Sequence, residues 1–310
     1  MDTKEKLKII QEVSGLTQTE IATKVGVSFV ALNTWWNGKS LPRQKHLLAI
    51  DLLYKEFTGQ NIIPESVLIA KKDLVDRKSK KFKSILNTIL NNPDIYDQFM
   101  LSLTYNSNKI EGSTLSENET ADIIFNNRAL PNKSIIEQLE VKNHQTSLQY
   151  LFSFLKEGKK IDEKLVLKLH AILMNGIRAD AGLYRSQSVR IVGANVPTAN
   201  FLKIPVLMRQ IIKDINKKQN DRIGQVSNIH ARFEKIHPFS DGNGRIGRLV
   251  LVAMLTQHNI APAVIKQSEK LLYNTCLQRA QQREDYTQLE EFICRSVMSG
   301  FDILIRKTIP

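Results

Sequence analysis

One segment near residue 240 limits what this chain can fold into more than any other part of the sequence. It reads Ile236-His237-Pro238-Phe239-Ser240-Asp241-Gly242-Asn243-Gly244-Arg245-Ile246-Gly247-Arg248 and runs directly into an apolar stretch, Leu249–Leu255. An apolar stretch this short suits a buried helix, whereas a membrane-spanning helix needs about 20 such residues. The sequence therefore predicts a glycine-containing loop followed by an apolar helix from Leu249 to His258, in a chain without a membrane span.

The residues of this segment are suited to binding phosphate. Gly242 and Gly244 allow backbone N–H groups to converge, and the N-terminus of the following helix adds partial positive charge. Such a loop favours anions. Arg245 and Arg248 are three residues apart, so both side chains can reach the outer phosphates from one side.

Two further residues of the segment supply chemistry. Asp241 can hold Mg²⁺ through its carboxylate, because Mg²⁺ sites combine one or two carboxylates with substrate phosphates. His237 is the only nearby side chain whose pKa suits it to accept a proton at neutral pH. The loop is not a Walker A loop, because no Gly-Lys-Ser/Thr follows its first glycine, and the protein-kinase triplets His-Arg-Asp and Asp-Phe-Gly do not occur.

The segment resembles the complete signature of the Fic family, His-Pro-Phe-x-Asp/Glu-Gly-Asn-Gly-Arg-x-x-Arg, and the resemblance extends over about residues 95–295. It implies an all-α domain that transfers AMP from ATP to a Ser, Thr or Tyr hydroxyl of a protein. The roles that it implies are a general base (His237), a Mg²⁺ ligand (Asp241), a phosphate cradle (Gly242, Asn243, Gly244) and a phosphate clamp (Arg245, Arg248).

A second part of the family pattern lies between residues 182 and 205. Gly182-Leu183-Tyr184-Arg185 precedes Val189–Val196, whose β-branched residues around Gly193 predict a short β-hairpin. Pro205 is expected to begin the next helix. The resemblance identifies the hairpin as a flap that accepts a segment of the target protein by strand addition. It also implies that His170 and His230 are scaffold residues and that Tyr273 lies near the adenine.

The segment Ser107-Asn108-Lys109-Ile110-Glu111-Gly112 predicts the end of a helix, with Gly112 as its stop. Glu111 would then stand where the helix dipole disfavours a carboxylate, so it needs a cationic partner. The segment resembles the Fic inhibitory motif, in which the glutamate pairs with the second arginine of the signature. The resemblance implies that Glu111 pairs with Arg248, that Ser107 lines the same site, and that the enzyme is self-inhibited.

The N-terminal residues predict two short helices around Gly26, the second beginning after Ser28. Over about residues 3–55 they resemble Cro/repressor-like helix-turn-helix domains, whose second helix enters the DNA major groove. The resemblance implies DNA contacts from Gln18, Ser28, Phe29, Val30, Asn33, Thr34, Lys39 and Arg43. A homodimer would place two such helices about one turn of DNA, ~34 Å, apart. The unit's net charge is only +2, from eight bases and six acids over residues 1–60, and a helical module that does not bind DNA is the alternative.

Length and composition set the domain organisation. The 310 residues, 42% of them hydrophobic and 24% charged, suggest two or three folded units. We expect a helix-turn-helix domain (1–60), a basic linker (61–90) and a catalytic domain (91–310) with its inhibitory segment near 107–112. The catalytic domain should be all-α apart from one hairpin, since a Ser116–Glu119 capping box and the glycines at 158 and 176 delimit helices.

The charge and the cysteines exclude some classes of protein. Net charge is +13 (44 Lys and Arg against 31 Asp and Glu), which favours polyanionic partners. Residues 71–83 contain seven bases and two acids, and they are either a solvated linker or a reinforcement of DNA binding. Two cysteines, Cys276 and Cys294, exclude a disulfide framework and a cysteine-built zinc site. No signal peptide is visible at the N-terminus, so a cytoplasmic protein is expected.

The sequence thus predicts a DNA-binding unit joined to a self-inhibited protein adenylyltransferase that uses ATP and Mg²⁺. Two alternatives stay open. One is the reverse direction, removal of AMP from modified proteins, with Glu111 acting on water. The other is a transcriptional regulator that only senses nucleotide. His237 argues against the second alternative, because sensing requires no base.

Overall fold

The computed structural model describes residues 2–58, 63–190 and 196–305, and every regular element in these ranges is helical. This confirms the all-α fold class. The chain divides into two compact units, Met1–Glu65 and Ser66–Pro310. No helix in the described ranges is both long and apolar enough to cross a membrane.

The first unit consists of α1 (Thr3–Ser14), α2 (Gln18–Val25), α3 (Phe29–Trp36) and α4 (Gln44–Thr58). Local caps set these boundaries. Thr17 forms a capping box at the start of α2, Gly26 ends that helix with φ +76°, and the Ser28 hydroxyl caps α3. The apolar faces enclose a separate core that includes Leu7, Ile10, Ile21, Leu32 and Tyr54.

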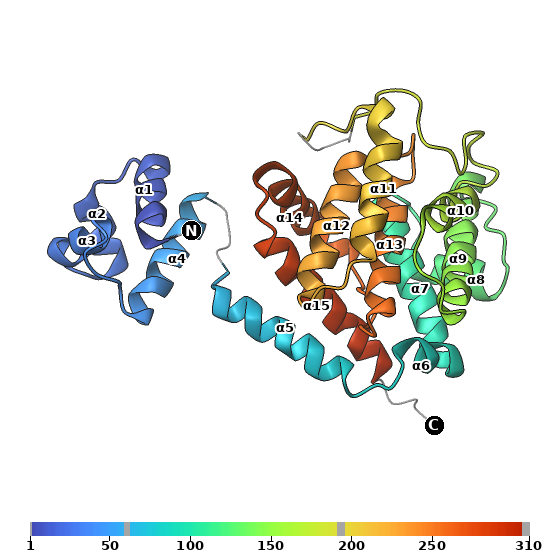
Figure 1. Cartoon of the computed structure of the whole chain (residues 1–310), viewed down its shortest axis with the longest axis horizontal. Helices are drawn as coiled ribbons and strands as arrows, with labels where there is room; N and C mark the ends of the chain where they lie inside the picture. Colours follow the sequence, from blue (N-terminus) through green and yellow to red (C-terminus); the bar gives the residue numbers. More distant parts are fainter. Residues whose placement is uncertain (1, 59–62, 191–195, 306–310) are drawn as a thin grey trace. The chain divides into compact units, whose positions relative to one another are not determined.

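The second unit contains eleven α-helices over its described residues (Figure 1). They are α5 (Glu65–Ser79), α6 (Ile85–Asn91), α7 (Pro93–Ile110), α8 (Glu117–Phe125), α9 (Ile135–Lys156), α10 (Glu163–Leu173), α11 (Ile204–Ile215), α12 (Arg222–Ile236), α13 (Asn243–Gln257), α14 (Lys270–Arg283) and α15 (Thr287–Leu304). Helix α13 is almost wholly buried and packs against α7, α9, α10 and α12. The segment 236–248 that resembles the family signature therefore runs into the start of α13, which is the central helix of this unit.

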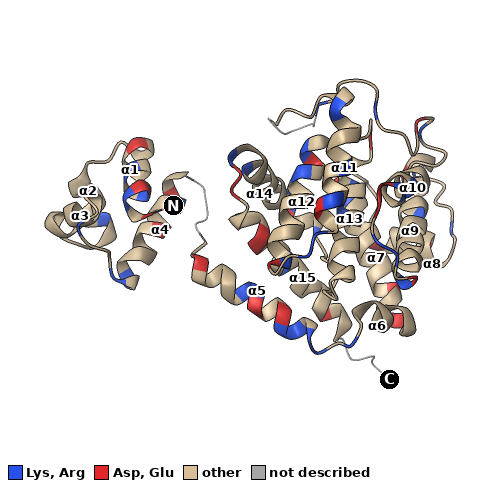
Figure 2. Ribbon diagram, in the orientation of Figure 1, with Lys and Arg blue, Asp and Glu red and all other residues tan. Residues whose placement is uncertain are grey.

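Residues 61–90 were expected to form a basic linker, but the structure shows helices in most of this range. Its described residues form α5 and α6, and Val75, Ile85 and Ile89 are fully buried in the core of the second unit. Two basic residues of α5 pair with acids of α15: Lys71 pairs with Glu291, and Lys72 lies 2.6 Å from Glu290. In the ribbon of Figure 2, segments of basic residues (blue) and acidic residues (red) alternate along α5. This stretch is a helix of the second unit because its apolar residues pack into that unit's core.

The expected start of the central helix at Leu249 was wrong. Helix α13 begins at Asn243, so Gly244 and Gly247 lie inside it. Both glycines have a carboxylate as a close neighbour, since a Cβ atom would lie 2.3 Å from Glu111 Oε1 at Gly244 and 2.1 Å from Glu234 Oε1 at Gly247. The glycines thus allow acidic side chains to approach the helix.

The expected hairpin over Val189–Val196 is not shown. Residues 191–195 lie outside the described residues, and those described on either side form no strand. The two arms are nevertheless joined, because the Thr198 hydroxyl donates a 2.8 Å hydrogen bond to the Val189 carbonyl. After this loop, α11 begins at Ile204 with Pro205 in its first turn, one residue before the predicted start.

Candidate active site

His237 is the C-cap of α12 and has a left-handed backbone, with φ +52°. Its N–H donates to the Phe233 carbonyl at 3.0 Å. Its ring Nδ1 lies 3.2 Å from the Glu234 carbonyl oxygen, which can only accept, so Nδ1 carries the proton and Nε2 is left as the acceptor. Burial lowers the pKa of His237 below its ordinary value of 6.5. The imidazole is therefore neutral at pH 7 and able to take a proton.

The loop after His237 is held by side-chain bonds to its own backbone. The Asn243 side chain accepts from the Phe239 N–H and donates to the Phe239 carbonyl, each at 2.8 Å. Gly242 caps α13 with φ +75°, a conformation that suits glycine, and its N–H donates to Asp241 Oδ1 at 2.6 Å. The buried Asn243 side chain thus holds the loop in shape through its bonds to Phe239. Because the side chain is engaged in this way, Asn243 can contact a phosphate only through its backbone.

The Glu111 carboxylate lies against the first turn of α13. Glu111 Oε1 is the atom that a Cβ at Gly244 would meet first. The carboxylate therefore occupies the N-terminus of α13, where the sequence predicts that phosphate binds. Glu111 is also the C-cap of α7, which ends at Ile110 as predicted. The carboxylate therefore reaches from the unfavourable end of one helix dipole to the favourable end of another.

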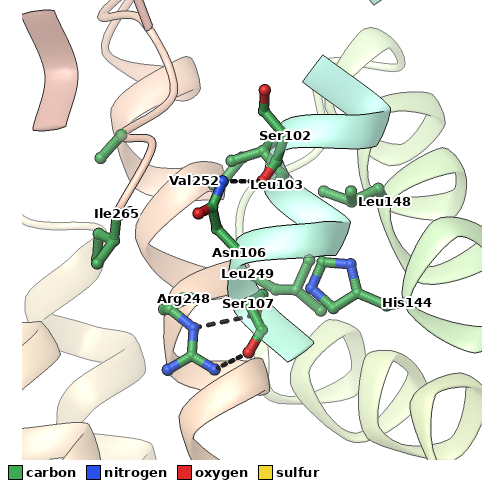
Figure 3. A pocket seen from close by; sticks show the side chains of 11 residues that line it. Ser102, Leu103, Asn106, Ser107, His144, Leu148, Arg248, Leu249, Val252 and Ile265 are labelled. Atoms are coloured by element: carbon green, nitrogen blue, oxygen red, sulfur yellow. Dashed lines mark hydrogen bonds between the residues drawn. The ribbon is translucent and has the colours of Figure 1, made fainter. Parts of the chain in front are cut away.

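Arg248 joins Glu111 to Ser107. Its Nη2 lies 2.6 Å from Glu111 Oε1 and 3.0 Å from the Ser107 carbonyl oxygen, and its Nε donates to Ser107 Oγ at 3.0 Å. Figure 3 shows these two arginine–serine bonds beside a pocket, with His144 nearby. Burial pushes the pKa of Glu111 upward, but the Arg248 guanidinium outweighs it and holds that pKa below its ordinary value. The expected Glu111–Arg248 contact is present.

Arg245 is engaged by a residue that the sequence reasoning missed. Its guanidinium, 3% exposed, pairs with Glu140 of α9 at 2.6 Å, and Asp241 lies farther away at 3.9 Å. Glu140 is one turn before the buried His144 and two turns before the buried Leu148, and this spacing could have indicated that it faces inward. Both signature arginines are thus paired with carboxylates from outside the signature.

Asp241 fits a Mg²⁺ site that is completed by substrate phosphates. Its side chain is 53% exposed and stands beside the start of α13. No group of three or more potential metal ligands occurs among the residues that the structure describes. A single carboxylate next to a phosphate cradle suits Mg²⁺, which keeps waters and phosphates as its other ligands.

Two buried histidines support the site as the family resemblance implies. His170 Nε2 donates to the Asp241 carbonyl at 3.1 Å, Nδ1 accepts the Gly182 N–H at 2.8 Å, and the ring stacks on Phe239. His230 lies 2.7 Å from the Tyr273 hydroxyl. Tyr273, expected near the adenine, is buried and bonded to this histidine, so it forms part of the core.

A buried acid, Glu234, was also missed. It is 7% exposed, and its Oε1 has no hydrogen-bond partner in the described parts of the chain. Burial raises the pKa of Glu234 to about 7. Glu234 lies on the last turn of α12, just before His237. Its position near the signature segment is seen only in the folded structure, where its carboxylate closely approaches Gly247.

The predicted DNA-contacting residues all lie at or near the surface of the first unit. Phe29, Val30, Lys39 and Arg43 are exposed. Several polar candidates already have local partners. The Ser28 hydroxyl caps α3, the Thr34 hydroxyl donates to the Ala31 carbonyl, and the Asn33 side chain accepts from Asn37. Gln18 and Asn33 are partly exposed. Their DNA contacts stay a prediction.

Residues 160–255, from before α10 to the end of α13, match the Fic/DOC family model. The chain is 28% identical over 250 residues to the protein adenylyltransferase Fic of Nematostella vectensis, covering 76% of this chain and 56% of the relative. The relative from Drosophila grimshawi is 28% identical over 208 residues, covering 66% and 42%. The chain spans about half the length of these curated relatives.

Solved structures support the same fold. A Fic domain-containing signalling protein of Bacteroides thetaiotaomicron aligns with a TM-score of 0.66 at 21% identity, covering 77% of this chain and all of the other. Fic-1 of C. elegans aligns with a TM-score of 0.68 at 19% identity, covering 96% and 91%. At these identities, both similarities concern the fold alone.

Proposed function

We propose that this chain is a protein adenylyltransferase, which transfers AMP from ATP to a Ser, Thr or Tyr hydroxyl of a protein. The observation that carries the proposal is the orientation of His237, whose Nε2 is left as a proton acceptor beside the N-terminus of α13. The complete signature and the relatives named protein adenylyltransferase support it.

The reaction would be an in-line displacement at the α-phosphorus. The target hydroxyl oxygen forms the new P–O bond, the bond from the α-phosphorus to the bridging oxygen breaks, and pyrophosphate leaves. The hydroxyl proton passes to Nε2 of His237, whose Nδ1–H stays on the Glu234 carbonyl. Backbone N–H groups of the first turn of α13 and the guanidinium of Arg248 stabilise the charge on the phosphates. Asp241 would hold Mg²⁺, which supplies positive charge to the phosphates when bound.

We further propose that Glu111 inhibits this reaction. Its carboxylate lies where phosphate would bind and pairs with Arg248 at 2.6 Å. While the pair is intact, Arg248 is not free to bind a phosphate, and the negative carboxylate repels one. ATP would then bind in a pose that misplaces the α-phosphorus. A misplacement of ~1 Å can cost on the order of 10²-fold in rate.

The two partner proposals concern the loop between residues 186 and 200 and the first unit. The loop carries the arms of the expected flap, and we propose that the target protein docks there. We propose that the first unit binds DNA through α3, as the Cro/repressor-like pattern implies, with a homodimer reading two half-sites.

The test of the proposed reaction uses labelled ATP with Mg²⁺ and a Glu111→Gly protein, in which transfer is released. The protein itself and a cell lysate should become labelled. Adding His237→Ala should abolish the label, by ~10²–10⁴-fold, while ATP binding persists, because the phosphate cradle is untouched. Undiminished transfer by the double variant would refute the role of His237. If the parent protein instead strips AMP from modified protein, and Glu111→Gly loses this activity, the reverse reaction is the function.

A further inference from the structure

Arg185 is a buried cation, and all its side-chain hydrogen bonds within the described residues go to backbone carbonyls. The side chain bonds to His237 O at 2.7 Å, Gln187 O at 2.7 Å, Ala199 O at 2.6 Å and Ile236 O at 3.3 Å. The residue is 3% exposed, and no carboxylate pairs with it among the described residues. A buried charge without a counter-ion is costly unless hydrogen bonds satisfy it. Its position is therefore set by these four carbonyls.

The four carbonyls belong to two different parts of the site. Gln187 and Ala199 stand at the two ends of the loop that carries the arms of the expected flap, and one guanidinium holds both ends. Ile236 and His237 are the last residue and the C-cap of α12, where the helix dipole is negative and favours a cation. The backbone N–H of Arg185 adds a bond to the Pro238 carbonyl at 3.0 Å. Arg185 thus joins the loop to the backbone at the catalytic base.

The backbone of His237 needs such support. Its φ of +52° is uncommon for a residue other than glycine. The His237 N–H is held by the Phe233 carbonyl, and the His237 carbonyl is held by Arg185 Nε. These two bonds hold both main-chain groups of His237, and with them the direction in which its ring projects.

We propose that Arg185 is a positioning residue that fixes the target-binding loop and the base His237 relative to each other. A hydroxyl held by the loop would then arrive at Nε2 in line for attack. This inference rests on the proposed transfer reaction. A lysine could not replace Arg185, because a single ammonium lacks the planar fork that reaches four carbonyls.

The test compares Arg185→Gln and Arg185→Lys with Arg178→Gln, all in the Glu111→Gly protein. Arg178 is a matched control, since it is a more exposed arginine seven residues earlier that pairs with Asp180. Self-modification at saturating ATP should fall by about 10²-fold in both Arg185 variants, and the KM for ATP should stay unchanged. Calorimetry with ATP gives the fraction of folded, binding-competent protein, so that a loss of folded protein is not counted as a loss of rate.

Hydrogen exchange provides a measurement that is independent of activity. The amides of residues 186–190, 196, 198–200, 237 and 239 should exchange faster in both Arg185 variants than in Arg178→Gln. A further variant, Thr198→Val, removes only the bond between the two arms, so exchange should rise in the loop but not at 237 and 239.

The possible results separate the two proposals. If no protein transfers AMP, the proposed reaction fails, and hydrogen exchange alone decides the role of Arg185. If the Arg185 variants match Arg178→Gln in rate per binding-competent molecule, or if exchange at 237 and 239 is unchanged, the positioning role is refuted.

Discussion

At the scale of single residues, Glu111 shows how one side chain can be placed by two helices. It is the C-cap of α7, where a carboxylate is unfavourable, and it extends to the N-terminus of α13, where a carboxylate is favourable. The contact is made possible by Gly244, which leaves room for the carboxylate. The guanidinium of Arg248 forms an ion pair with this carboxylate at 2.6 Å. Phosphate would compete for the same helix end and the same guanidinium.

The first prediction follows from this competition. Glu111→Gly should raise the rate of self-modification on the order of 10²-fold, because Arg248 is freed and the repelling carboxylate is gone. Arg248→Ala should be inactive with or without Glu111, since the phosphate clamp is lost in both. Transfer of label from ATP to the protein measures both effects. Glu117→Gly, an exposed acid in the first turn of α8, serves as the control. If Glu111→Gly is folded, binds ATP and is no more active than the parent, Glu111 is not inhibitory.

At the scale of helices, glycines inside α13 and α15 contradict helix propensity for reasons of packing. Alanine is preferred to glycine within a helix by about 1 kcal/mol. In the fold, however, Gly247 faces Glu234, and Gly300 of α15 faces the Pro262 backbone carbonyl, which a Cβ atom would approach to 2.1 Å. A backbone atom cannot move aside as the end of a side chain can. The helices therefore keep glycine where other segments come closest.

The second prediction is that Gly300→Ala destabilises the second unit although it improves helix propensity. Overpacking of this kind costs about 1–3 kcal/mol, which exceeds the gain of about 1 kcal/mol. The unfolding midpoint in urea should fall. Ser299→Ala, the preceding residue of α15, should leave it nearly unchanged. An increase in stability of Gly300→Ala would show that α15 and the Pro262 segment are not in close contact in solution.

At the scale of the whole molecule, the chain has two units with separate apolar cores and an excess of positive charge. Among the described residues, the first unit buries one apolar cluster, and the second buries a large cluster and a small one around Ile123. The basic residues early in α5 pair with acids of the second unit, so they do not form a free basic tail. The second unit also buries several histidines and the acid Glu234, whose Oε1 has no hydrogen-bond partner among the described residues. These features make the stability of the molecule depend on pH, and its proposed binding of DNA should depend on salt.

The third prediction concerns pH. Burial lowers the pKa of His144 and His230 to about 3 and that of His170 to about 4. Below pH 6.5, the ordinary value, these residues bind protons only in the unfolded chain, so stability should fall as pH falls. Glu234 acts in the opposite direction, because its carboxyl keeps a proton up to about pH 7 when folded and up to 4.5 when unfolded.

For these four groups the net difference reaches about two protons as the pH falls from 6.5 to 5, three from His144, His170 and His230 minus one from Glu234. His237 and His258, whose pKa values burial also lowers, act in the same direction as these histidines. The free energy of unfolding should therefore fall by up to about 3 kcal/mol per pH unit. Urea unfolding of the full chain at pH 7.5, 6.5 and 5.5 measures it. The variant Glu234→Gln removes the opposing group, so its loss of stability on acidification should be steeper. A free energy of unfolding that does not change over this range would contradict the prediction.

The fourth prediction concerns DNA. The full chain should bind a fragment of its own promoter with an affinity that decreases as salt increases, because phosphate contacts release counterions. Replacing Lys39 and Arg43 by alanine together should weaken binding to all sequences and reduce the salt slope by about 1.8. Asn33→Ala should instead relax the preference at one base. Lys55→Ala, on α4, is the control. Absence of binding to any genomic fragment would favour a protein-interaction role for the first unit.

The sequence by itself determined those features that depend on neighbours within a few residues. The capping box of Ser116 and Glu119, the turn at Gly26 and the stop at Gly112 could be predicted because each is a local hydrogen bond or a local backbone conformation. The signature segment could be recognised because its residue types are contiguous. The Glu111–Arg248 contact was predicted as well, but only through the resemblance to a known inhibitory motif.

Only the tertiary structure decided which distant residues meet. Glu140 pairs with Arg245 across 105 residues, and Arg185 bonds to His237 across 52, and no periodicity in the sequence records either contact. The central helix begins at Asn243 and has acidic side chains packed against its glycines, although glycines in the sequence suggested a loop. Residues 66–90 join the second unit because Val75 and Ile85 enter its core. Local interactions fix caps and turns, whereas burial and ion pairing depend on the packing of the complete chain.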